Sequence, residues 1–381
     1  MDRNCDVIVL GLGAMGSATA ACLAERGLRL AGFDAFTPPH RNGSSHGRTR
    51  IFRQAYFEDP GYVHLLLRAR ELWTRLERDA GQLLFHTTGA LMIGPAAGRL
   101  VAGSATSARQ FDLPHAMLDA NELRHRWPAF YVSDDTVALL EPAAGYLNPE
   151  LCITQMLAQA ARHGASLHYN TPVTAWNATP GSVTVATPRG TWTAGHLVIT
   201  AGPWAPQVLS DLGLPLRVTR QAIFWFEPTG SVDAFREDRF PIYMMETATD
   251  EPMLYGFPLT GPDAEGVKVA VHGSEKSWTP ETVDRTIRPE DESNIRRRLA
   301  VAIPSLAGRL LHAETCLYTM TPDENFILGT HPLHANVAIA AGFSGHGFKF
   351  APIVGELLAD LVTSGESGSI PAMFSLTRFS R

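Results

Sequence analysis

The sequence predicts an α/β fold in which a parallel-sheet domain is interrupted by a second domain with an antiparallel sheet. Short apolar runs that end in glycine occur near both ends of the chain, at residues 6–16 and 336–347, and such runs are typical of buried parallel strands. Between residues 216 and 318 the pattern changes to short alternating segments, which are typical of antiparallel strands. The first pattern then resumes, so we expect the second domain to be an insertion.

The parallel domain begins with a strand, a glycine-rich turn, a helix and a second strand. Residues 6–10 are apolar, residues 14–26 are rich in Ala, Ser and Thr and stop at Gly27, and residues 28–33 are apolar again. The turn permits a sharp reversal, a close approach of a phosphate to the backbone and close packing of the helix. It consists of Gly11, Leu12, Gly13, Ala14, Met15 and Gly16.

Asp34 ends the second strand, about 20 residues beyond the glycine turn, where a carboxylate can accept hydrogen bonds from a ribose. The free N–H groups and the positive dipole end of the first helix would face a pyrophosphate. We therefore interpret this unit as a Rossmann-type dinucleotide site. The alternative is that the glycines serve only to pack the helix on the sheet.

The composition excludes several classes of function. The 381 residues are 45% hydrophobic and 18% charged, and the formal net charge of -6 gives no reason to expect nucleic acid or an anionic membrane as partner. The N-terminal residues lack a signal-peptide pattern and no apolar run is long enough to span a membrane, so we expect a cytoplasmic protein. The four cysteines lack paired spacing, which argues against a disulfide framework and against a metal site.

The elements between the two ends follow from periodicity. An apolar run at residues 196–200 ends in Thr-Ala201-Gly202, is followed by Trp204, and predicts a third parallel strand beside the first two. Residues 62–80 and 149–163 predict amphipathic helices. The remaining predictions are strands at 88–94 and 136–140, a short helix at 121–127, a small meander formed by 165–170, 182–186 and 190–193, and a helix at 290–301.

These elements predict two domains that are packed together. The cofactor domain is predicted to contain residues 1–84, 147–217 and 322–381. The substrate domain is predicted to contain residues 85–146 and 218–321.

A second glycine-rich turn distinguishes between cofactors. It contains Gly342, Gly345 and Gly347, and Phe348 and Lys349 follow it at the start of a helix. FAD fits two such turns better than NAD does, because a nicotinamide dinucleotide is usually bound by two consecutive βαβαβ halves, and here the chain leaves for an antiparallel sheet. The helix that begins near the lysine would point its N–H groups at the negative charge of a reduced flavin.

Several residues have both a functional and an ordinary interpretation. Lys268 and His272 share one face of an alternating strand; a lysine on a buried sheet would favour electron transfer to O2, whereas on a surface strand it would lie in water. Arg50 and Arg53 either make surface salt bridges or include a clamp for a substrate carboxylate. Cys316, taken alone, is more typical of a core residue than of a catalytic one.

Taken together, these segments resemble the monomeric sarcosine oxidase family, which includes N-methyltryptophan oxidase, over essentially the whole chain. The matching motifs are Gly11-Leu-Gly-Ala-Met-Gly16, Asp34-Ala-Phe, Asn42-Gly-Ser, Tyr255-Gly-Phe-Pro, Cys316-Leu-Tyr-Thr and Ala341-Gly-Phe-Ser-Gly-His-Gly-Phe-Lys349-Phe. The resemblance implies a monomeric flavoprotein oxidase of glutathione-reductase-like architecture. Such an enzyme takes hydride from a secondary (N-alkyl) amino acid, releases an imine that hydrolyses to an aldehyde, and passes the electrons to O2 to give hydrogen peroxide.

The resemblance also implies residue roles. Cys316 would carry the FAD covalently through an 8α-S-cysteinyl bond, Arg53 and Lys349 would hold the substrate carboxylate, and Lys268 would activate O2. His272, Tyr255 and Met244 would line the substrate cavity, and the expected catalytic residues are Lys268, His272, Arg50 and Tyr255. Arg50 would also pack against the flavin, and further cofactor contacts are expected from Ser44, His46, Thr49, Ala201, Gly202, Trp204, Gly342, Gly345, Gly347 and Phe348.

The chain departs from the family pattern at Ser45, Arg48, Gln54, Asn325, Gly329 and residues 245–252. Because these positions include the loop over the cavity, the substrate is expected to be an N-methyl or cyclic secondary amino acid with an unresolved side chain. The alternatives are an FAD-dependent oxidase or dehydrogenase of another amino acid, such as a D-amino acid, an NAD-dependent dehydrogenase, and an FAD-binding protein without turnover.

Overall fold

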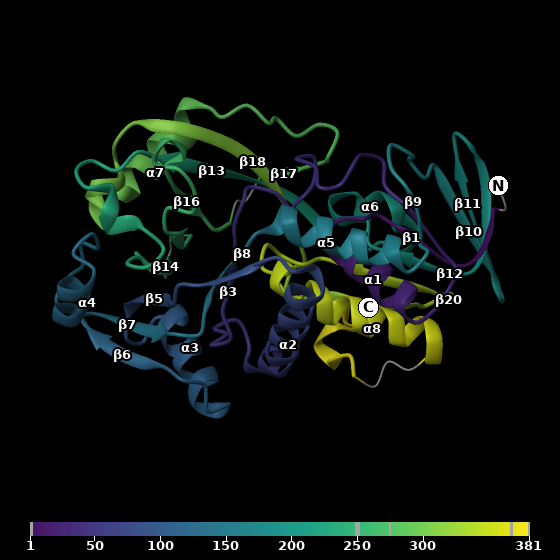
Figure 1. The fold of residues 1–381 in the computed structure, drawn as a ribbon, viewed down its shortest axis with the longest axis horizontal. Coiled ribbons are helices and arrows are strands. Elements are labelled where there is room, and N and C mark those ends of the chain that lie inside the picture. The colour runs from purple at the N-terminus through teal and green to yellow at the C-terminus, as the bar shows by residue number, and fades with distance from the viewer. Residues whose placement is uncertain (1–2, 248–251, 274–275, 366–368, 380–381) are drawn as a thin grey trace.

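The computed structural model describes residues 3–247, 252–273, 276–365 and 369–379. The ribbon is elongated, with one sheet towards each end and a small third sheet between them (Figure 1). None of the helices within the described ranges is long and apolar enough to cross a membrane.

The first sheet has eight strands and contains the predicted parallel strands. β1 (Asn4–Leu10) pairs in parallel with β2 (Leu30–Phe33) on one side and with β12 (Gly190–Ile199) on the other. β9 (Ser166–His168) and β20 (His334–Ala341) extend the parallel part next to β2 and β12. The antiparallel additions are β10 (Ala175–Thr179), β11 (Ser182–Thr187) and β19 (Ile327–His331).

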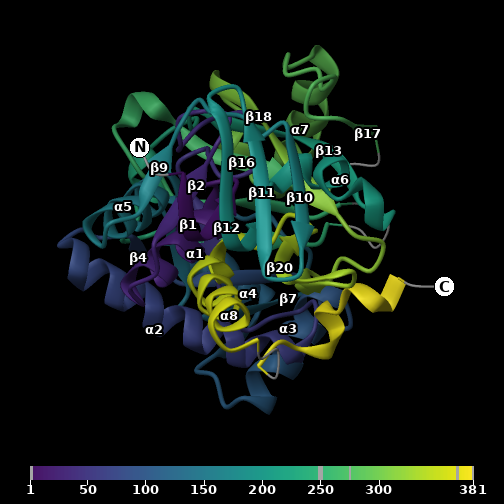
Figure 2. The same cartoon turned by 90° about the vertical axis from the view of Figure 1, so that its right-hand side faces the viewer.

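Helices α1 (Ala14–Glu25), α5 (Pro149–Arg162) and α8 (Ala351–Ser364) pack together beside this sheet (Figure 2). Small residues allow the helices to come close: a Cβ on Gly355 would lie 2.7 Å from the backbone of Ala18. The predicted amphipathic helix is α2 (Val63–Ala80), which buries one face and exposes Arg68, Arg75 and Arg78. This packing holds the start of α1 at the carboxyl ends of the parallel strands, where dinucleotides bind in such sheets.

The second sheet has nine strands in the order β17-β13-β16-β15-β14-β5-β7-β6, with β18 also paired to β13. All of its pairs are antiparallel, as predicted, except that β14 and β5 run in parallel. The strands are β5 (Ala90–Pro95), β6 (Ala116–Asp119), β7 (Thr136–Glu141), β13 (Arg217–Phe226), β14 (Ile242–Met245), β15 (Leu254–Gly256), β16 (Val267–Val271), β17 (Ser277–Trp278) and β18 (Leu310–Met320). Helices α3 (Arg99–Gln110), α4 (Ala120–Arg126) and α7 (Pro289–Ala302) belong to the same end of the molecule.

A three-stranded sheet lies between the two large ones. It has the order β3 (Arg50–Phe52), β8 (Gly145–Leu147) and β4 (Phe85–Thr87), and both of its pairs are antiparallel. The short helix α6 (Ala205–Val208) follows β12. A 3-10 turn, η7 (Phe348–Phe350), leads directly into α8.

The α/β fold class is confirmed, and one local prediction is wrong. Residues 166–168 do not join a meander; they form β9, which pairs in parallel with β2. The physical reason is that α5 carries the chain back across the sheet, so that the next strand runs parallel to the earlier ones, whereas alternation within three residues carries no information about its partner. The meander consists of β10, β11 and β12. The division into two domains stays a prediction.

Candidate active site

The glycine turn after β1 has the geometry of a phosphate-binding turn. Gly11 has a φ of +91°, and a Cβ there would lie 2.6 Å from the carbonyl oxygen of Thr200. A Cβ on Gly16 would collide with the carbonyl oxygen of Gly11. A Cβ on Gly13 would meet nothing within 4 Å, so this residue borders open space. The first and third glycines are thus required by the fold, while the second leaves room for a ligand.

Asp34 also shapes this turn. Its Oδ2 accepts a hydrogen bond of 2.9 Å from the N–H of Leu12, and its Oδ1 accepts one of 2.9 Å from the N–H of Phe36. The carboxylate is 8% exposed and lines the adjacent cavity. Its orientation is therefore fixed before any ligand arrives, and its contact with a ribose stays a prediction.

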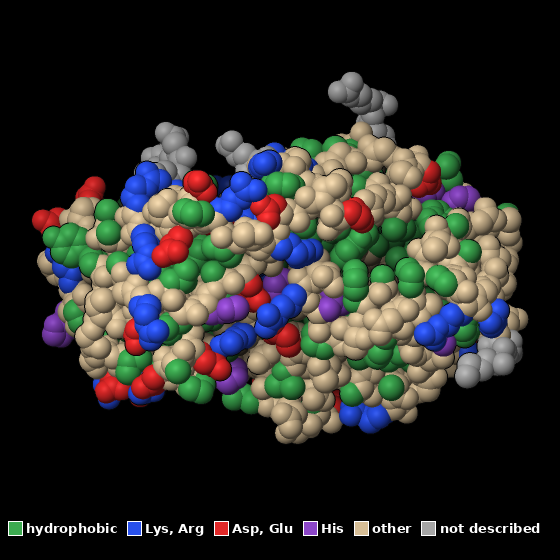
Figure 3. All heavy atoms as spheres, turned by 90° about the horizontal axis from the view of Figure 1, so that it is seen from above, with side chains coloured by type: hydrophobic (Ala, Val, Ile, Leu, Met, Phe, Trp, Pro, Cys, Tyr) green, Lys and Arg blue, Asp and Glu red, His purple; other side chains and the backbone are tan. Residues whose placement is uncertain are grey.

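A cavity of about 820 Å³ extends from this turn to the second glycine-rich turn. This volume lies in the range of cofactor sites. Figure 3 shows a hollow lined by hydrophobic side chains on the upper face, towards the end of the molecule that holds β9 to β12. The predicted cofactor residues that line the cavity are Gly11, Gly13, Ala14, Met15, Asp34, Ser44, Arg50, Ala201, Gly202, Trp204, Gly342, Gly345, Gly347 and Phe348. A long dinucleotide fits the volume, and the open space at the first turn fits its pyrophosphate.

A second, smaller cavity of about 70 Å³ adjoins the first. Arg50, Tyr318, Gly345 and Phe348 line both. The residues predicted to contact the substrate all line the smaller one: Arg53, Lys349, Met244, Tyr255 and His272. Thr49 and Cys316 also line it, whereas Gly16, His46 and Lys268 border neither cavity.

Two buried cations lie at this small cavity. Arg53 is 2% exposed, so its interpretation as a surface residue is wrong. Its Nη2 lies 2.7 Å from both carboxylate oxygens of Glu58. Lys349 donates a 2.9 Å hydrogen bond to the carbonyl oxygen of His346, and burial together with the charge of Arg53 lowers the pKa of Lys349 to about 7. Both groups are available to an anionic part of a substrate, with Glu58 as the internal competitor.

Lys268 is buried as well, with 3% of its surface exposed, so the surface-strand alternative is wrong. Its Nζ donates to the carbonyl oxygen of Gly47 at 2.6 Å, and to the carbonyl oxygen and Oγ1 of Thr49 at 3.0 Å each. Burial and the nearby charge of Arg50 lower the pKa of Lys268 well below its usual value. Three acceptors for three donors fix the position of this nitrogen.

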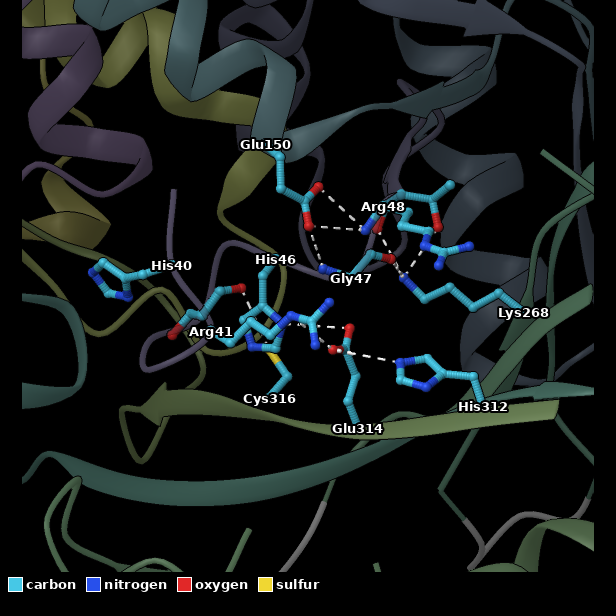
Figure 4. A network of polar contacts seen from close by, with 12 residues as sticks. His40, Arg41, His46, Gly47, Arg48, Glu150, Lys268, His312, Glu314 and Cys316 are labelled. Atoms are coloured by element: carbon cyan, nitrogen blue, oxygen red, sulfur yellow. Dashed lines mark hydrogen bonds and ion pairs between the residues drawn. The ribbon is translucent and has the colours of Figure 1, made fainter. Parts of the chain in front are cut away.

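Cys316 lies beside Arg50, and Figure 4 shows His46 next to it. The Nη2 of Arg50 donates to Sγ at 3.5 Å and to the carbonyl oxygen of Ser44 at 2.6 Å. Burial alone would raise the pKa of the Cys316 thiol, but Arg50, His46 and Lys268 together lower it to about 7. A low-pKa thiol among cations is typical of a reactive cysteine rather than of a core residue.

His272 and Tyr255 approach the cavity from the sheet. Nδ1 of His272 is 3.4 Å from the hydroxyl of Tyr318, and burial lowers the pKa of the His272 imidazole. The His272 and Tyr255 rings are in edge contact, 6.3 Å apart between centroids. Met244 is 7% exposed on β14. This wall is mainly apolar with few polar atoms, which suits a small ligand.

Sequence reasoning missed two acids near these cations whose side chains are 10% and 13% exposed, Glu58 and Glu314. Glu58 pairs with Arg53, and the cations around it hold its pKa at about 2 although it is buried. Glu314 lies on β18 two residues before Cys316, on the same face of the strand. The two-residue spacing was a usable signal for Glu314, whereas nothing in the local pattern distinguishes Glu58 from a surface acid. The departures predicted over 248–251 lie outside the described residues.

Within the ranges that the structure describes, no group of three or more His, Cys, Asp or Glu side chains is arranged to hold a metal ion.

Comparison with known proteins gives a match over nearly the whole chain. The sequence model of the FAD dependent oxidoreductase family (DAO) matches residues 6–361. The chain is 47% identical over 380 residues to monomeric sarcosine oxidase of Streptomyces avermitilis, which covers 99% of this chain and 98% of that protein. It is 35% identical over 378 residues to N-methyl-L-tryptophan oxidase of Yersinia pestis, covering 98% of this chain and 99% of that protein.

Solved structures show the same fold. NikD, described as an unusual amino acid oxidase essential for nikkomycin biosynthesis, superposes with a TM-score of 0.86 at 24% identity and covers 98% of each chain. L-Proline dehydrogenase from P. horikoshii has a TM-score of 0.85 at 24% identity and covers 100% of this chain and 98% of its own. At these identities the likeness concerns the fold alone.

Proposed function

Because the chain belongs to the FAD-dependent oxidoreductase family, within the group of monomeric sarcosine oxidases, we propose that it oxidises the N-alkyl C–N bond of a small secondary amino acid. The observation that carries this proposal is the pair of cations, Arg53 and Lys349, in a small cavity that shares lining residues with the cofactor cavity. Family membership also displaces the alternative of a nicotinamide-dependent dehydrogenase.

FAD, when bound, supplies the two-electron acceptor for this oxidation. The residues present fit it, since the open space at Gly13 suits a pyrophosphate and the 820 Å³ cavity runs from there to the residues that it shares with the smaller cavity. The ring-system end is the end where Arg50, Tyr318 and Phe348 line both cavities. Cys316 lines the smaller cavity at this junction, which supports its role as the point of covalent attachment.

The carboxylate of the substrate is assigned to Arg53 and Lys349. Arginine presents two parallel donors to a carboxylate, and a lysine adds a point charge. Binding at these two groups orients the α-amine and its alkyl group towards the cofactor cavity. His272 has a lowered pKa and is neutral at pH 7, so it does not repel an amine and can accept a hydrogen bond from it.

The size of the cavity favours a short side chain. A cavity holds one water molecule for each roughly 10–15 Å³ that the centre of a water-sized sphere can reach. The smaller cavity, with about 70 Å³, therefore holds roughly five to seven water-sized groups. Sarcosine or a pyrrolidine ring is of that size, whereas an indole side chain exceeds it. We therefore assign sarcosine or a cyclic secondary amino acid as the substrate class.

Lys268 is the residue assigned to the O2 step. Its position is fixed by Gly47 and Thr49, and a cation held in place stabilises the anion that forms when O2 accepts an electron. The products of turnover would then be hydrogen peroxide and an imine that hydrolyses in water.

Two experiments test this function. Peroxide release is measured with sarcosine, L-proline and N-methyl-L-tryptophan; the first or second should react well and the third poorly, and no release with any of them would contradict the oxidase assignment. Acid precipitation followed by intact-mass measurement tests the linkage: a yellow pellet with one FAD on Cys316 is expected, whereas a colourless pellet would refute it. A third experiment tests the oligomeric state: size-exclusion chromatography should give a monomer, and a larger species would contradict that expectation.

A further inference from the structure

The inference begins with the sheet face that supports Cys316. Glu314 and Cys316 are two residues apart on β18, so their side chains leave the same face of the strand. On β13 their partners are Ile223 and Gln221. His46, from the loop before β3, lies against this face, and Figure 4 shows it with Glu314 and Cys316.

The contacts of His46 favour one arrangement. The ring is 2% exposed, and its Nδ1 lies 3.5 Å from Oε1 of Glu314. Among the described residues, neither ring nitrogen has a hydrogen-bond partner at normal distance. Burying an imidazole without a firm partner costs free energy, so its presence calls for an explanation, and a catalytic role is one. Nδ1 lies next to the carboxylate and Nε2 is the other ring nitrogen, while Sγ of Cys316 donates to the carbonyl oxygen of Ser44 at 3.3 Å.

Resting on the proposed attachment of FAD to Cys316, we propose that Glu314 is a positioning residue that holds His46 as the proton acceptor of the Cys316 thiol. The proton leaves Sγ and binds Nε2 of His46. The imidazolium that results directs its Nδ1–H at Glu314. No electron is transferred in this step, and the product is a thiolate ready to form a bond.

The pKa values of Glu314, His46 and Cys316 agree with this proton transfer. Burial acts against the charged form of His46, but the neighbouring Cys316 thiol and Glu314 carboxylate raise its pKa to about 9. Burial acts against ionised Glu314 as well, yet His46 lowers its pKa to about 2. At pH 7 Glu314 is therefore a carboxylate, His46 is an imidazolium and about half of Cys316 is a thiolate, as in other cysteine sites activated by a histidine.

Other charged and titratable groups face this cluster. Arg50 and Lys268 add positive charge near the thiol. Arg41 and His312 lie 3.6 and 3.8 Å from Glu314. Glu150, at the start of α5, accepts hydrogen bonds from the N–H groups of Gly47 and Arg48 and so fixes the loop that carries His46. The positive groups near the thiol contribute to the low pKa of Cys316, so removal of Glu314 should raise that pKa without restoring its ordinary value.

The test is the pH profile of Cys316 alkylation in the FAD-free full-length chain, prepared from a riboflavin-limited host. Iodoacetamide labelling is followed by mass spectrometry of the peptide that contains Cys316, with the peptides of Cys5, Cys22 and Cys152 as internal references. The wild-type thiol should be half-reactive near pH 7. In Glu314→Gln the profile should move to higher pH, with labelling at pH 6 about tenfold slower if the thiol pKa rises by about 1, and equal rates at high pH.

The matched control is Glu265→Gln, which removes the same charge from an acid that pairs with Arg48 on the His46 loop but is 38% exposed and does not contact His46. Its profile should coincide with that of the wild type. Coincident profiles for Glu314→Gln and wild type, or a loss of reactivity equal at all pH values, would overturn the proposal. A wild-type half-point at or above the ordinary thiol value of about 8.5 would overturn it even if the variant does not fold.

Adding FAD to the same proteins gives a second measurement. The rate of covalent attachment should show the same upward move of its pH profile in Glu314→Gln and none in Glu265→Gln. If the wild-type chain bound FAD without a covalent bond, the attachment in the proposed function would fail, whereas the labelling profile would still decide the role of Glu314.

Discussion

Replacement of Arg53 by Met gives the sharpest test of the carboxylate site. Arg53 and Glu58 are 2% and 10% exposed and are joined at 2.7 Å through both carboxylate oxygens. Removal of one partner from a buried pair leaves an uncompensated charge and costs about 3–5 kcal/mol of stability. The double variant Arg53→Met/Glu58→Gln should regain much of this loss, since no buried charge is left alone.

The effect on substrate follows from the same contacts. A hydrogen bond to a charged group contributes about 1.5–3 kcal/mol, which corresponds to roughly 10- to 150-fold in affinity. Arg53 is already engaged by Glu58, so the substrate exchanges one carboxylate for another, and we expect the low end, about tenfold. In anaerobic reduction by sarcosine the apparent Kd should rise by this factor. The apparent Kd of a secondary amine without a carboxylate should change little.

Arg48→Met is the control for this experiment. Arg48 lies in the preceding loop and pairs with Glu265, but it is 42% exposed, so its loss should cost less than about 1 kcal/mol. An equal loss of reactivity towards both amines in Arg53→Met would refute the carboxylate assignment. A stability loss no larger than that of Arg48→Met would refute the argument from the buried pair.

Three further predictions concern the other cations and the glycine turn. Lys268→Met should slow reoxidation by O2 far more than anaerobic reduction by substrate in stopped-flow measurements, and equal slowing would remove Lys268 from the O2 step. Acetate, as a bare carboxylate, should bind less tightly as pH rises from 6 to 8, because Lys349 with its pKa of about 7 is charged below that pH and neutral above it; Lys349→Met should abolish this dependence, and its persistence would point to another group. Gly16→Ala should lower the yield of folded protein because its Cβ meets the Gly11 carbonyl, whereas Gly13→Ala should fold but bind FAD more weakly, since its Cβ points into open space; identical behaviour of the two variants would contradict the different roles of these glycines.

The first glycine turn shows how much of the fold the local sequence pattern could predict. The order of strand, turn, helix and acid between residues 4 and 34 is as expected, because glycine spacing and apolar runs act on the nearest residues. The register of β9 was not predictable, because pairing with β2 depends on a helix crossover rather than on three residues of sequence.

The cations show the opposite limit. The alternating pattern placed Lys268 on one face of β16, but it could not show whether that face is exposed to water or buried. Gly47 and Thr49, which lie over 200 residues away in the chain, cover the lysine and accept its hydrogen bonds. In the same way, the sequence around Cys316 is typical of a core residue. Its reactivity is indicated only by Arg50 and His46, which the tertiary structure places beside it.

The sequence by itself determined most of the helices and strands of this protein, the dinucleotide turn and the chemical types of the site residues, since these depend on short-range sterics and periodicity. The tertiary structure alone decided which charges meet: Glu58 with Arg53, and Glu314 with His46. Whether an ionisable group is buried, and beside which partner, is set by segments far apart in the chain, and those two facts fix its pKa and therefore its chemistry.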